Sequence, residues 1–150
     1  MTVTASEYRF TDQIGYLLRR AYQRHMAIFR EIVPDSQLTA GQFVVLCTIN
    51  ECADCQVRDI VEATGIDEPS VRGIIERLKW RELLDVRHEP GDARHLDIRL
   101  TPAGRTIIDT VTPLAAQISE LTFGDLAEDE RATITTLLRR LSGIEPGRGA

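Results

Sequence analysis

The sequence lacks any long hydrophobic run, and no segment approaches the roughly 18–20 apolar residues that a bilayer-spanning helix needs. The first residues, MTVTASEYRFTDQ, have no apolar core, so we expect no secretory signal peptide. Cysteine is scarce, with three residues, an odd number that favours a reducing cytoplasm over a disulfide framework. Internal repeats and low-complexity segments are also absent. The expectation is a cytoplasmic protein that does not contact a membrane.

Catalytic motifs are missing as well. The sequence has no nucleophile–base pair, phosphate-binding loop or metal motif, so we expect neither an enzyme nor a cofactor. An excess of positive charge is also missing, because 18 Lys and Arg stand against 23 Asp and Glu, a net charge of −5. That balance argues against non-specific coating of nucleic acid but allows a local basic surface. Residues 68–105 are the richest in cations, with eight Lys and Arg against seven acids.

What the sequence does have is helical periodicity and enough apolar residues, 43%, for a core. Its 150 residues suit one domain or the subunit of a compact dimer. The spacing of apolar residues predicts six helices, within 8–33, 39–51, 56–65, 67–83, 101–124 and 126–141. Two predicted strands, 83–89 and 95–100, flank a Pro90-Gly91-Asp92 turn. The predicted fold class is therefore mainly α with a small β-hairpin.

Two short helices joined by a tight turn and followed by a hairpin indicate a winged helix-turn-helix. Its second helix has to enter a DNA major groove about 12 Å wide, with small or polar residues at its N-terminal end. The helix that Asp67 caps has such residues, which are Pro69, Ser70, Arg72 and Gly73. Arg77 is a candidate either for a phosphate contact or for an ion pair with neighbouring acids.

The hairpin is the predicted wing, and its Arg94 is placed to lie along or within the minor groove, where negative potential is concentrated. The alternative for Arg94, and equally for Ser70 and Arg72, is an ordinary solvated surface residue without a partner.

The segment VRDIVEATGIDEPSVRGIIERLKWRELLDVRHEPGDARHLDIRLTPAG resembles the DNA-binding core of the MarR (multiple-antibiotic-resistance regulator) family of repressors. The most specific part of the resemblance is the pattern D-x-R-x5-L-T-x2-G, which consists of Asp92, Arg94, Leu100, Thr101 and Gly104. The likeness extends over nearly the whole chain. It implies that Arg94 enters the minor groove and that Asp92 orients it. It also implies a homodimeric, ligand-responsive repressor that binds double-stranded DNA at a pseudo-palindromic operator.

The chain departs from that family at two positions. The family usually has Gly just after the recognition helix, where this chain has Glu82, so we expect the helix to end differently. The family's recognition helix often carries a basic residue at its second position, where this chain has Glu68. A glutamate can accept a hydrogen bond from cytosine N4 but repels phosphate, so the role of Glu68 at the DNA face stays open.

The single 1–150 subunit divides into dimerisation helices, at 8–33 and 102–143, and a DNA-binding lobe at 39–101. The terminal helices are more apolar than an isolated surface would tolerate, which favours a helical dimer interface, as the resemblance also implies. The candidate interface residues are Ile14, Leu17, Val111, Leu114, Ile118, Leu121, Leu137, Leu138 and Leu141.

Arg19, Arg20 and His25, in LLRRAYQRHMAIF, are the candidate effector-binding residues. His25 lies on the apolar stripe of the first helix, where an imidazole needs a partner. That partner is either a carbonyl, in a structural role, or an effector carboxylate held together with Arg19 or Arg20. A helix rich in Arg and His at this place resembles MarR-type regulators of aromatic-acid catabolism. The resemblance implies an aromatic carboxylate or its CoA thioester as the effector.

Two other functions fit the same fold. Cys52 and Cys55 form a C-x-x-C motif that would suit a thiol- or metal-responsive regulator, although chance or packing also explains the pair. Cys47, in an apolar helix, is expected in the core. The remaining alternative is a winged-helix protein-interaction module that never contacts DNA.

Overall fold

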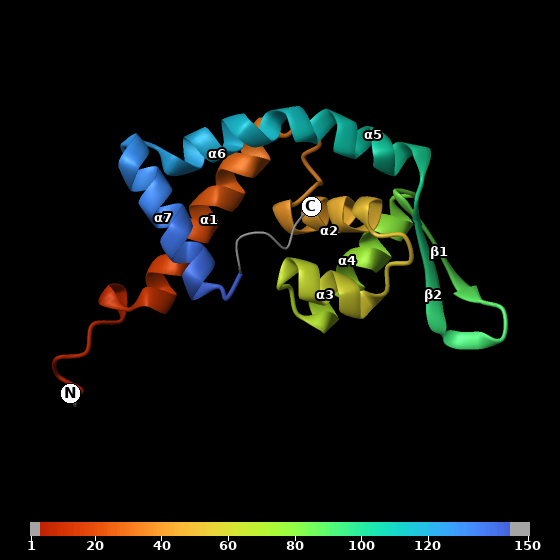
Figure 1. Cartoon of the computed structure of the whole chain (residues 1–150), viewed down its shortest axis with the longest axis horizontal. Helices are drawn as coiled ribbons and strands as arrows, with labels where there is room; N and C mark the ends of the chain where they lie inside the picture. The colour runs from red at the N-terminus through yellow and green to blue at the C-terminus, as the bar shows by residue number, and fades with distance from the viewer. Residues whose placement is uncertain (1–3, 145–150) are drawn as a thin grey trace.

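The protein, described over residues 4–144 by a computed structural model, is built from helices and one hairpin (Figure 1). Its elements in chain order are η1 (Phe10–Asp12), α1 (Ile14–Ile32), α2 (Ala40–Glu51), α3 (Val57–Thr64), α4 (Glu68–Trp80), β1 (Leu84–Glu89), β2 (Asp92–Leu100), α5 (Pro102–Val111), η2 (Thr112–Leu114), α6 (Ala115–Phe123) and α7 (Glu128–Leu141). β1 and β2 form an antiparallel two-stranded sheet. The predicted fold class is confirmed. Within residues 4–144, every helix is too short or too polar to cross a membrane.

The first helix is shorter than predicted. It begins at Ile14 rather than near residue 8, because Gln13 is extended (φ −82°, ψ 138°) and separates it from the 3₁₀ turn η1. This turn brings the ring of Phe10 against Tyr16, with ring centroids 5.3 Å apart in an edge-on contact. At its other end α1 stops at Ile32, just before the predicted proline stop.

The helix predicted over 101–124 consists of three pieces. α5 ends at Val111, the 3₁₀ turn η2 follows, and α6 begins at Ala115. Pro113 lies in η2 and explains the break, because proline has no backbone N–H to donate and its ring clashes with the carbonyl four residues earlier. The pieces follow one another as an arch, in which α5 lies against α2 and α6 lies against α1 (Figure 1).

One apolar core lies where α2, α3, α4 and the base of the hairpin meet. Its fully buried members include Val45, Leu46, Ile60, Val71 and Leu78. The helix boundaries around this core agree with the sequence, because the side chains of Thr39 and Asp67 cap α2 and α4. Gly65 ends α3 with φ 70°, which produces the tight turn into α4.

α4 ends in the geometry that glycine favours, although the residue there is Glu82. Its φ of 58° is the only positive value for a non-glycine residue between 4 and 144. The Glu82 N–H donates to the Lys79 carbonyl, and the Leu83 N–H donates to the Leu78 carbonyl, both at 2.9 Å. These two bonds form a Schellman motif, closed by the buried side chains of Leu78 and Leu83. The expectation of a different helix end is therefore wrong, and Glu82 takes up backbone strain instead.

Backbone contacts join the end of α4 to the start of α5. Thr101 caps α5 by accepting from the Gly104 N–H at 3.1 Å, and its hydroxyl donates to the Glu82 carbonyl at 2.6 Å. The Thr101 N–H donates to the Leu83 carbonyl at 3.2 Å. Gly104 lies so close that a Cβ there would be 2.2 Å from the Leu83 carbonyl oxygen. The Thr101–Gly104 half of the D-x-R-x5-L-T-x2-G pattern is therefore a structural joint between α4 and α5.

The hairpin has a regular base and an irregular tip. Its register runs from Leu84 opposite Leu100 to His88 opposite Leu96, and it shifts beyond that pair. The turn contains Gly91 with φ 88°, a value that side chains disfavour. The base packs on the core, whereas the tip projects away from it (Figure 1).

Candidate nucleic-acid interface

α4 presents its predicted DNA-facing residues to solvent and its apolar residues to the core. Pro69, Ser70, Arg72 and Arg77 are exposed, and Gly73 is half-buried. A Cβ on Gly73 would meet nothing nearer than the Arg77 guanidinium at 3.9 Å, so the surface there is open. The N-terminal half of α4 therefore has the small, polar outer surface that insertion into a groove needs.

The start of α4 is ordered by Asp67 and Ser70. The Asp67 carboxylate accepts from the Ser70 backbone N–H at 2.9 Å and from the Ser70 hydroxyl at 2.8 Å. Both bonds favour the ionised carboxylate and lower the pKa of Asp67. Because the hydroxyl proton of Ser70 is donated to Asp67, the Ser70 oxygen can serve another group only as an acceptor.

Glu68, whose role the sequence left open, pairs with Arg72 one turn further along α4. The Glu68 carboxylate oxygen Oε1 accepts from Arg72 Nη2 at 2.8 Å and from Nε at 3.0 Å. Both side chains are well exposed, so the pair adds little to the stability of the fold. Its effect is to hold the Arg72 guanidinium against the N-terminal half of α4, with Nη1 unengaged by Glu68.

The hairpin tip carries the predicted wing residues. The Asp92 carboxylate accepts from the Arg94 backbone N–H at 3.0 Å, so Asp92 orders the backbone of Arg94 and not its guanidinium. His88 Nδ1 lies 3.2 Å from the Ala93 carbonyl and closes the tip from the other strand. The Arg94 side chain is exposed and pairs with no acid among residues 4–144. Its charge is therefore available to an external anion.

A groove of about 830 Å³ lies between α4 and the hairpin. The four cations that line it are Arg58, Arg72, Lys79 and Arg94, and the three carboxylates are Glu68, Glu76 and Asp92. This face therefore has a positive excess, although the whole chain has a net charge of −5. Of the arginines predicted to bind DNA, Arg72 and Arg94 both line this groove, whereas Arg77 does not.

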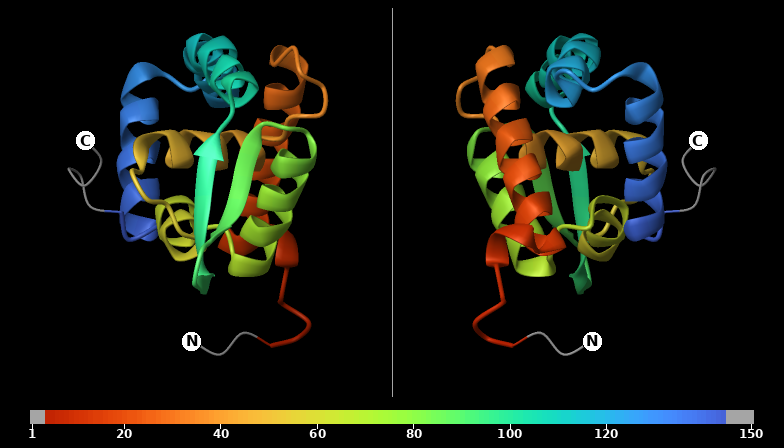
Figure 2. Two further views of the ribbon diagram at one scale, coloured as in Figure 1. Left: turned by 90° about the vertical axis from the view of Figure 1, so that its right-hand side faces the viewer. Right: turned by 90° about the vertical axis from the view of Figure 1, so that its left-hand side faces the viewer.

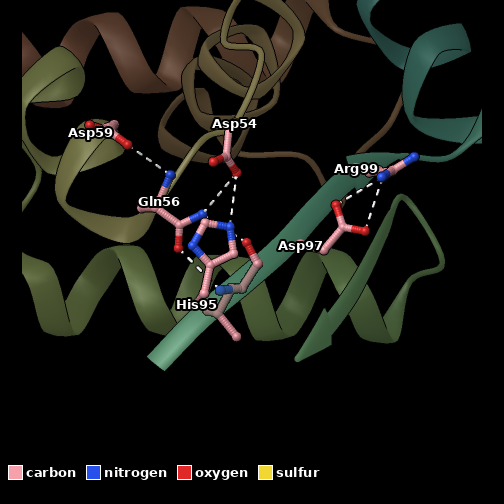
Figure 3. A network of polar contacts seen from close by, with 7 residues as sticks. Asp54, Gln56, Asp59, His95, Asp97 and Arg99 are labelled. Carbon is pink, nitrogen blue, oxygen red and sulfur yellow. Dashed lines mark hydrogen bonds and ion pairs between the residues drawn. The ribbon is translucent and has the colours of Figure 1, made fainter. Parts of the chain in front are cut away.

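Gln56, which was not among the predicted site residues, ties the hairpin to α3. Its side-chain amide accepts from the Leu96 N–H at 3.1 Å and donates to the Leu96 carbonyl at 2.8 Å. Asp54 adds a second link, with its Oδ1 3.2 Å from His95 Nε2 (Figure 3). The only signal in the sequence is a glutamine at a helix N-cap, where shorter polar residues are preferred.

The proposed effector residues differ in their surroundings, since two are exposed to solvent and one contacts another helix. Arg19 and Arg20 are exposed on α1. His25 is half-buried, and its Nδ1 lies 2.9 Å from the Thr122 hydroxyl on α6. That hydroxyl donates its one proton to the Ile118 carbonyl at 2.7 Å, so His25 donates from Nδ1. His25 thus has a structural partner, a hydroxyl rather than a carbonyl, and its Nε2 is left to accept from another group.

Arg24, also absent from the predicted set, contacts the same part of α6. Its guanidinium donates to the carbonyls of Leu121, at 2.7 Å, and Thr122 at the end of α6. A cation at a helix C-terminus satisfies unpaired carbonyls and the helix dipole. Arg24 and His25 together fasten α1 to α6, so the region around His25 is a joint between helices as well as a candidate site.

The three cysteines are free thiols. Burial raises the pKa of the Cys55 thiol to about 12, and the neighbouring Cys52 adds to this shift. Redox-active and metal-binding cysteines react as thiolates, so this environment disfavours Cys55 as the reacting thiol. Over residues 4–144 no three His, Cys, Asp or Glu side chains gather as a metal site requires. Cys47, expected in the core, is only partly buried.

The candidate dimer surface needs one correction. Val111 and Ile118 are 1% and 4% exposed and belong to the core of the subunit itself, so they are not available to a partner. No residue of α7 is buried, and the apolar residues it exposes are Ile134, Leu137, Leu138 and Leu141. α1 likewise exposes Ile14, Leu17 and Leu18. The side views show α7 standing at the edge of the subunit, away from α1 (Figure 2).

Comparison with known proteins gives consistent matches. A model described as the MarR family matches residues 38–96. Over 142 residues the chain is 43% identical to the HTH-type transcriptional repressor NicR of Pseudomonas putida, which covers 95% of this chain and 90% of NicR. NicR is a regulator by name, as the sequence predicted for this chain, and not an enzyme.

Two solved structures extend these matches to the fold. BpsR of Bordetella bronchiseptica, whose DNA binding is regulated by 6-hydroxynicotinic acid, matches with a TM-score of 0.83 and 51% identity, over 91% of this chain and 98% of BpsR. The PcaV transcriptional regulator of Streptomyces coelicolor, in complex with its natural ligand, matches with a TM-score of 0.79 and 26% identity, over 95% of this chain and 98% of PcaV.

Proposed function

The chain belongs to the MarR family of transcriptional regulators, and from this membership we propose that it is a homodimeric repressor released from its operator by a small aromatic carboxylate. One observation carries the DNA-binding part: Arg72 of α4 and Arg94 of the hairpin line one groove whose cations outnumber its carboxylates. In a chain with a net charge of −5, this face is suited to the phosphate backbone.

In the proposed complex α4 enters the major groove, with Pro69 and Gly73 leaving room for close approach and the Ser70 oxygen accepting from a base edge. Arg72, held by Glu68, is directed at a guanine, where a bidentate contact contributes about 1–3 kcal/mol of discrimination. Arg77, on the exposed face outside the groove, is assigned to a phosphate. Arg94 reaches the minor groove, with its backbone fixed by Asp92.

A homodimer supplies the second half-site. Winged helix dimers contact two half-sites about 34 Å apart, and a pseudo-palindromic operator matches their two-fold symmetry. The apolar residues on α7 and α1 support this assembly, because nothing within the described subunit covers them.

The proposed effector is a hydroxylated aromatic acid such as 6-hydroxynicotinic acid. The support is BpsR, which is 51% identical and is regulated by that compound. Among the two predicted effectors, this relative favours the free acid over a CoA thioester. Arg19 and Arg20 are exposed to bind a carboxylate, and His25 offers Nε2 to a ring hydroxyl. Release follows only if the ligand binds one dimer geometry more tightly than the DNA-bound one.

Operator affinity of Arg94→Ala tests the DNA-binding part. We expect about a tenfold loss, since a contact of 1–3 kcal/mol corresponds to roughly 5- to 150-fold in affinity, and a shallower dependence on salt. Fluorescence anisotropy with the protein's own upstream DNA measures both. Arg99→Ala is the matched control, because Arg99 lies on the same strand but is paired with Asp97 at 2.8 Å. Unchanged affinity for Arg94→Ala would overturn the wing assignment, whereas a parent protein without specific, salt-dependent affinity for this DNA would favour a protein-interaction module.

The effector part is tested with His25→Asn and Arg20→Ala. Asn can still donate to Thr122 as Nδ1 does, but it lacks a group at the position of Nε2. We expect both variants to bind the operator normally and to need at least tenfold more 6-hydroxynicotinic acid for release. Arg30→Ala, exposed at the far end of α1, is the control. Release at the unchanged concentration in both variants would place the effector elsewhere.

A further inference from the structure

Gln56 makes an unusual contact for the first residue of a helix. As the N-cap of α3 it has an extended backbone and makes no side-chain capping hydrogen bond. Its side chain instead reaches residue 96, 40 positions later in the chain, and pairs with both the N–H and the carbonyl of Leu96. Its second amide proton is directed at Asp54 Oδ1, at 3.3 Å. All the polar atoms of this amide are therefore engaged (Figure 3).

The local structure of α3 gives no reason for this glutamine. Ser, Thr, Asp and Asn are the preferred N-caps, and lacking such a cap costs a helix about 1 kcal/mol. The cap of α3 depends instead on Asp59, whose carboxylate accepts from the Gln56 backbone N–H at 2.8 Å. A shorter residue would serve the helix better, whereas a glutamine is long enough to reach the hairpin.

The contact falls at the point where the hairpin stops being regular. Leu96 faces His88 in the last regular pair, and the register shifts beyond it. The Gln56 amide bonds the outer edge of β2 there, as the amide of a third strand would. Arg94 lies two residues further on, roughly 7 Å along the strand, among exposed tip residues. A two-stranded hairpin is only marginally stable alone, so the direction of its tip depends on where the base is held.

We propose that Gln56 is a positioning residue for DNA recognition. The hydrogen bonds of its amide hold the wing against α3 and so fix the position of Arg94 relative to α4. This inference rests on the proposed function. DNA engages the two elements together most tightly when the distance from the recognition helix to the wing is set before binding. Without these two hydrogen bonds, the tip of the wing has to become ordered when DNA binds. The entropic cost of that ordering weakens the complex. Gln56 itself need not touch DNA.

Gln56→Ser separates this role from a structural one, because serine caps helices better but is too short to reach Leu96. We expect a melting temperature equal to or above that of the parent and about a tenfold weaker operator affinity. In the Arg94→Ala background the same substitution should change operator affinity by less than about twofold, because the hydrogen bonds of Gln56 affect DNA binding through the position of Arg94. Gln37→Ser, at an exposed glutamine in the α1–α2 loop, is the control.

Three outcomes would overturn the proposal: operator affinity of Gln56→Ser equal to the parent, a loss fully additive with that of Arg94→Ala, or rapid hydrogen exchange at the Leu96 amide of the parent. The exchange measurement needs no variant, so it decides even if Gln56→Ser does not fold. Failure of the proposed function is distinguishable, because the parent protein itself would then show no specific affinity for its upstream DNA.

Discussion

At position 82 the backbone keeps the geometry that glycine, the family's usual residue there, favours, although the residue in this chain is glutamate. Its φ of 58° lies in the left-handed region, which costs residues with a Cβ about 1–3 kcal/mol. The Schellman bonds and the buried Leu78–Leu83 pair hold the turn in spite of this cost. Strain at this point is therefore local, and α4 keeps its direction.

Glu82→Gly should relieve that strain. Glycine adopts positive φ freely but also has more conformations in the unfolded chain, so we expect a net gain of about 1 kcal/mol in the free energy of unfolding. Urea denaturation measures it. Glu62→Gly, within α3, is the matched substitution and should instead destabilise by about 1 kcal/mol. If both substitutions destabilised the protein equally, the strain assigned to Glu82 would be absent.

At the scale of elements, the hydrogen bonds at the helix ends determine how the recognition helix, the wing and α5 are held together. Thr101 bonds the Glu82 and Leu83 backbone and caps α5, so the end of α4 and the start of α5 move together. The wing strand β2 enters the same joint, one residue earlier. α4, the wing and the arch of α5 and α6 are thereby linked, which gives a change at the arch a direct path to the DNA-facing elements.

Gly104→Ala tests this joint. A Cβ at residue 104 would lie 2.2 Å from the Leu83 carbonyl oxygen, and this nearest neighbour is backbone, which cannot move away as a flexible side chain could. We expect a loss of about 1–3 kcal/mol in stability from overpacking. Gly73→Ala is the control, because its Cβ meets open space on α4 and alanine favours helix, so its stability should rise. Equal melting temperatures for the parent and Gly104→Ala would contradict a rigid joint.

Across the whole molecule, local patterns in the sequence predicted structure well, and long-range pairings stayed hidden. Thr39, Asp67 and Gly65 mark helix ends through contacts within a few residues, so they can be read from the sequence. The Gln56–Leu96 pair spans 40 residues and follows no periodicity. Apolar spacing identifies a buried face but not what buries it, which is why Val111 was assigned to a dimer interface and lies in the subunit core.

The exposed apolar residues of α7 are the candidate surface for assembly of the dimer. α7 is a 14-residue helix with no buried residue, and two of its large apolar side chains, Leu137 and Leu141, are 47% and 66% exposed. A helix of this length is marginal alone in water, so its stability in solution requires a covering surface. We expect Leu137→Asp to leave the DNA-binding lobe folded, to convert a dimer into monomers in analytical ultracentrifugation and to abolish tight operator binding. Thr136→Asp, exposed on the side of α7 away from the apolar residues, should preserve the dimer. A Leu137→Asp protein that stayed dimeric would move the interface away from α7, since a buried carboxylate without a partner is not tolerated.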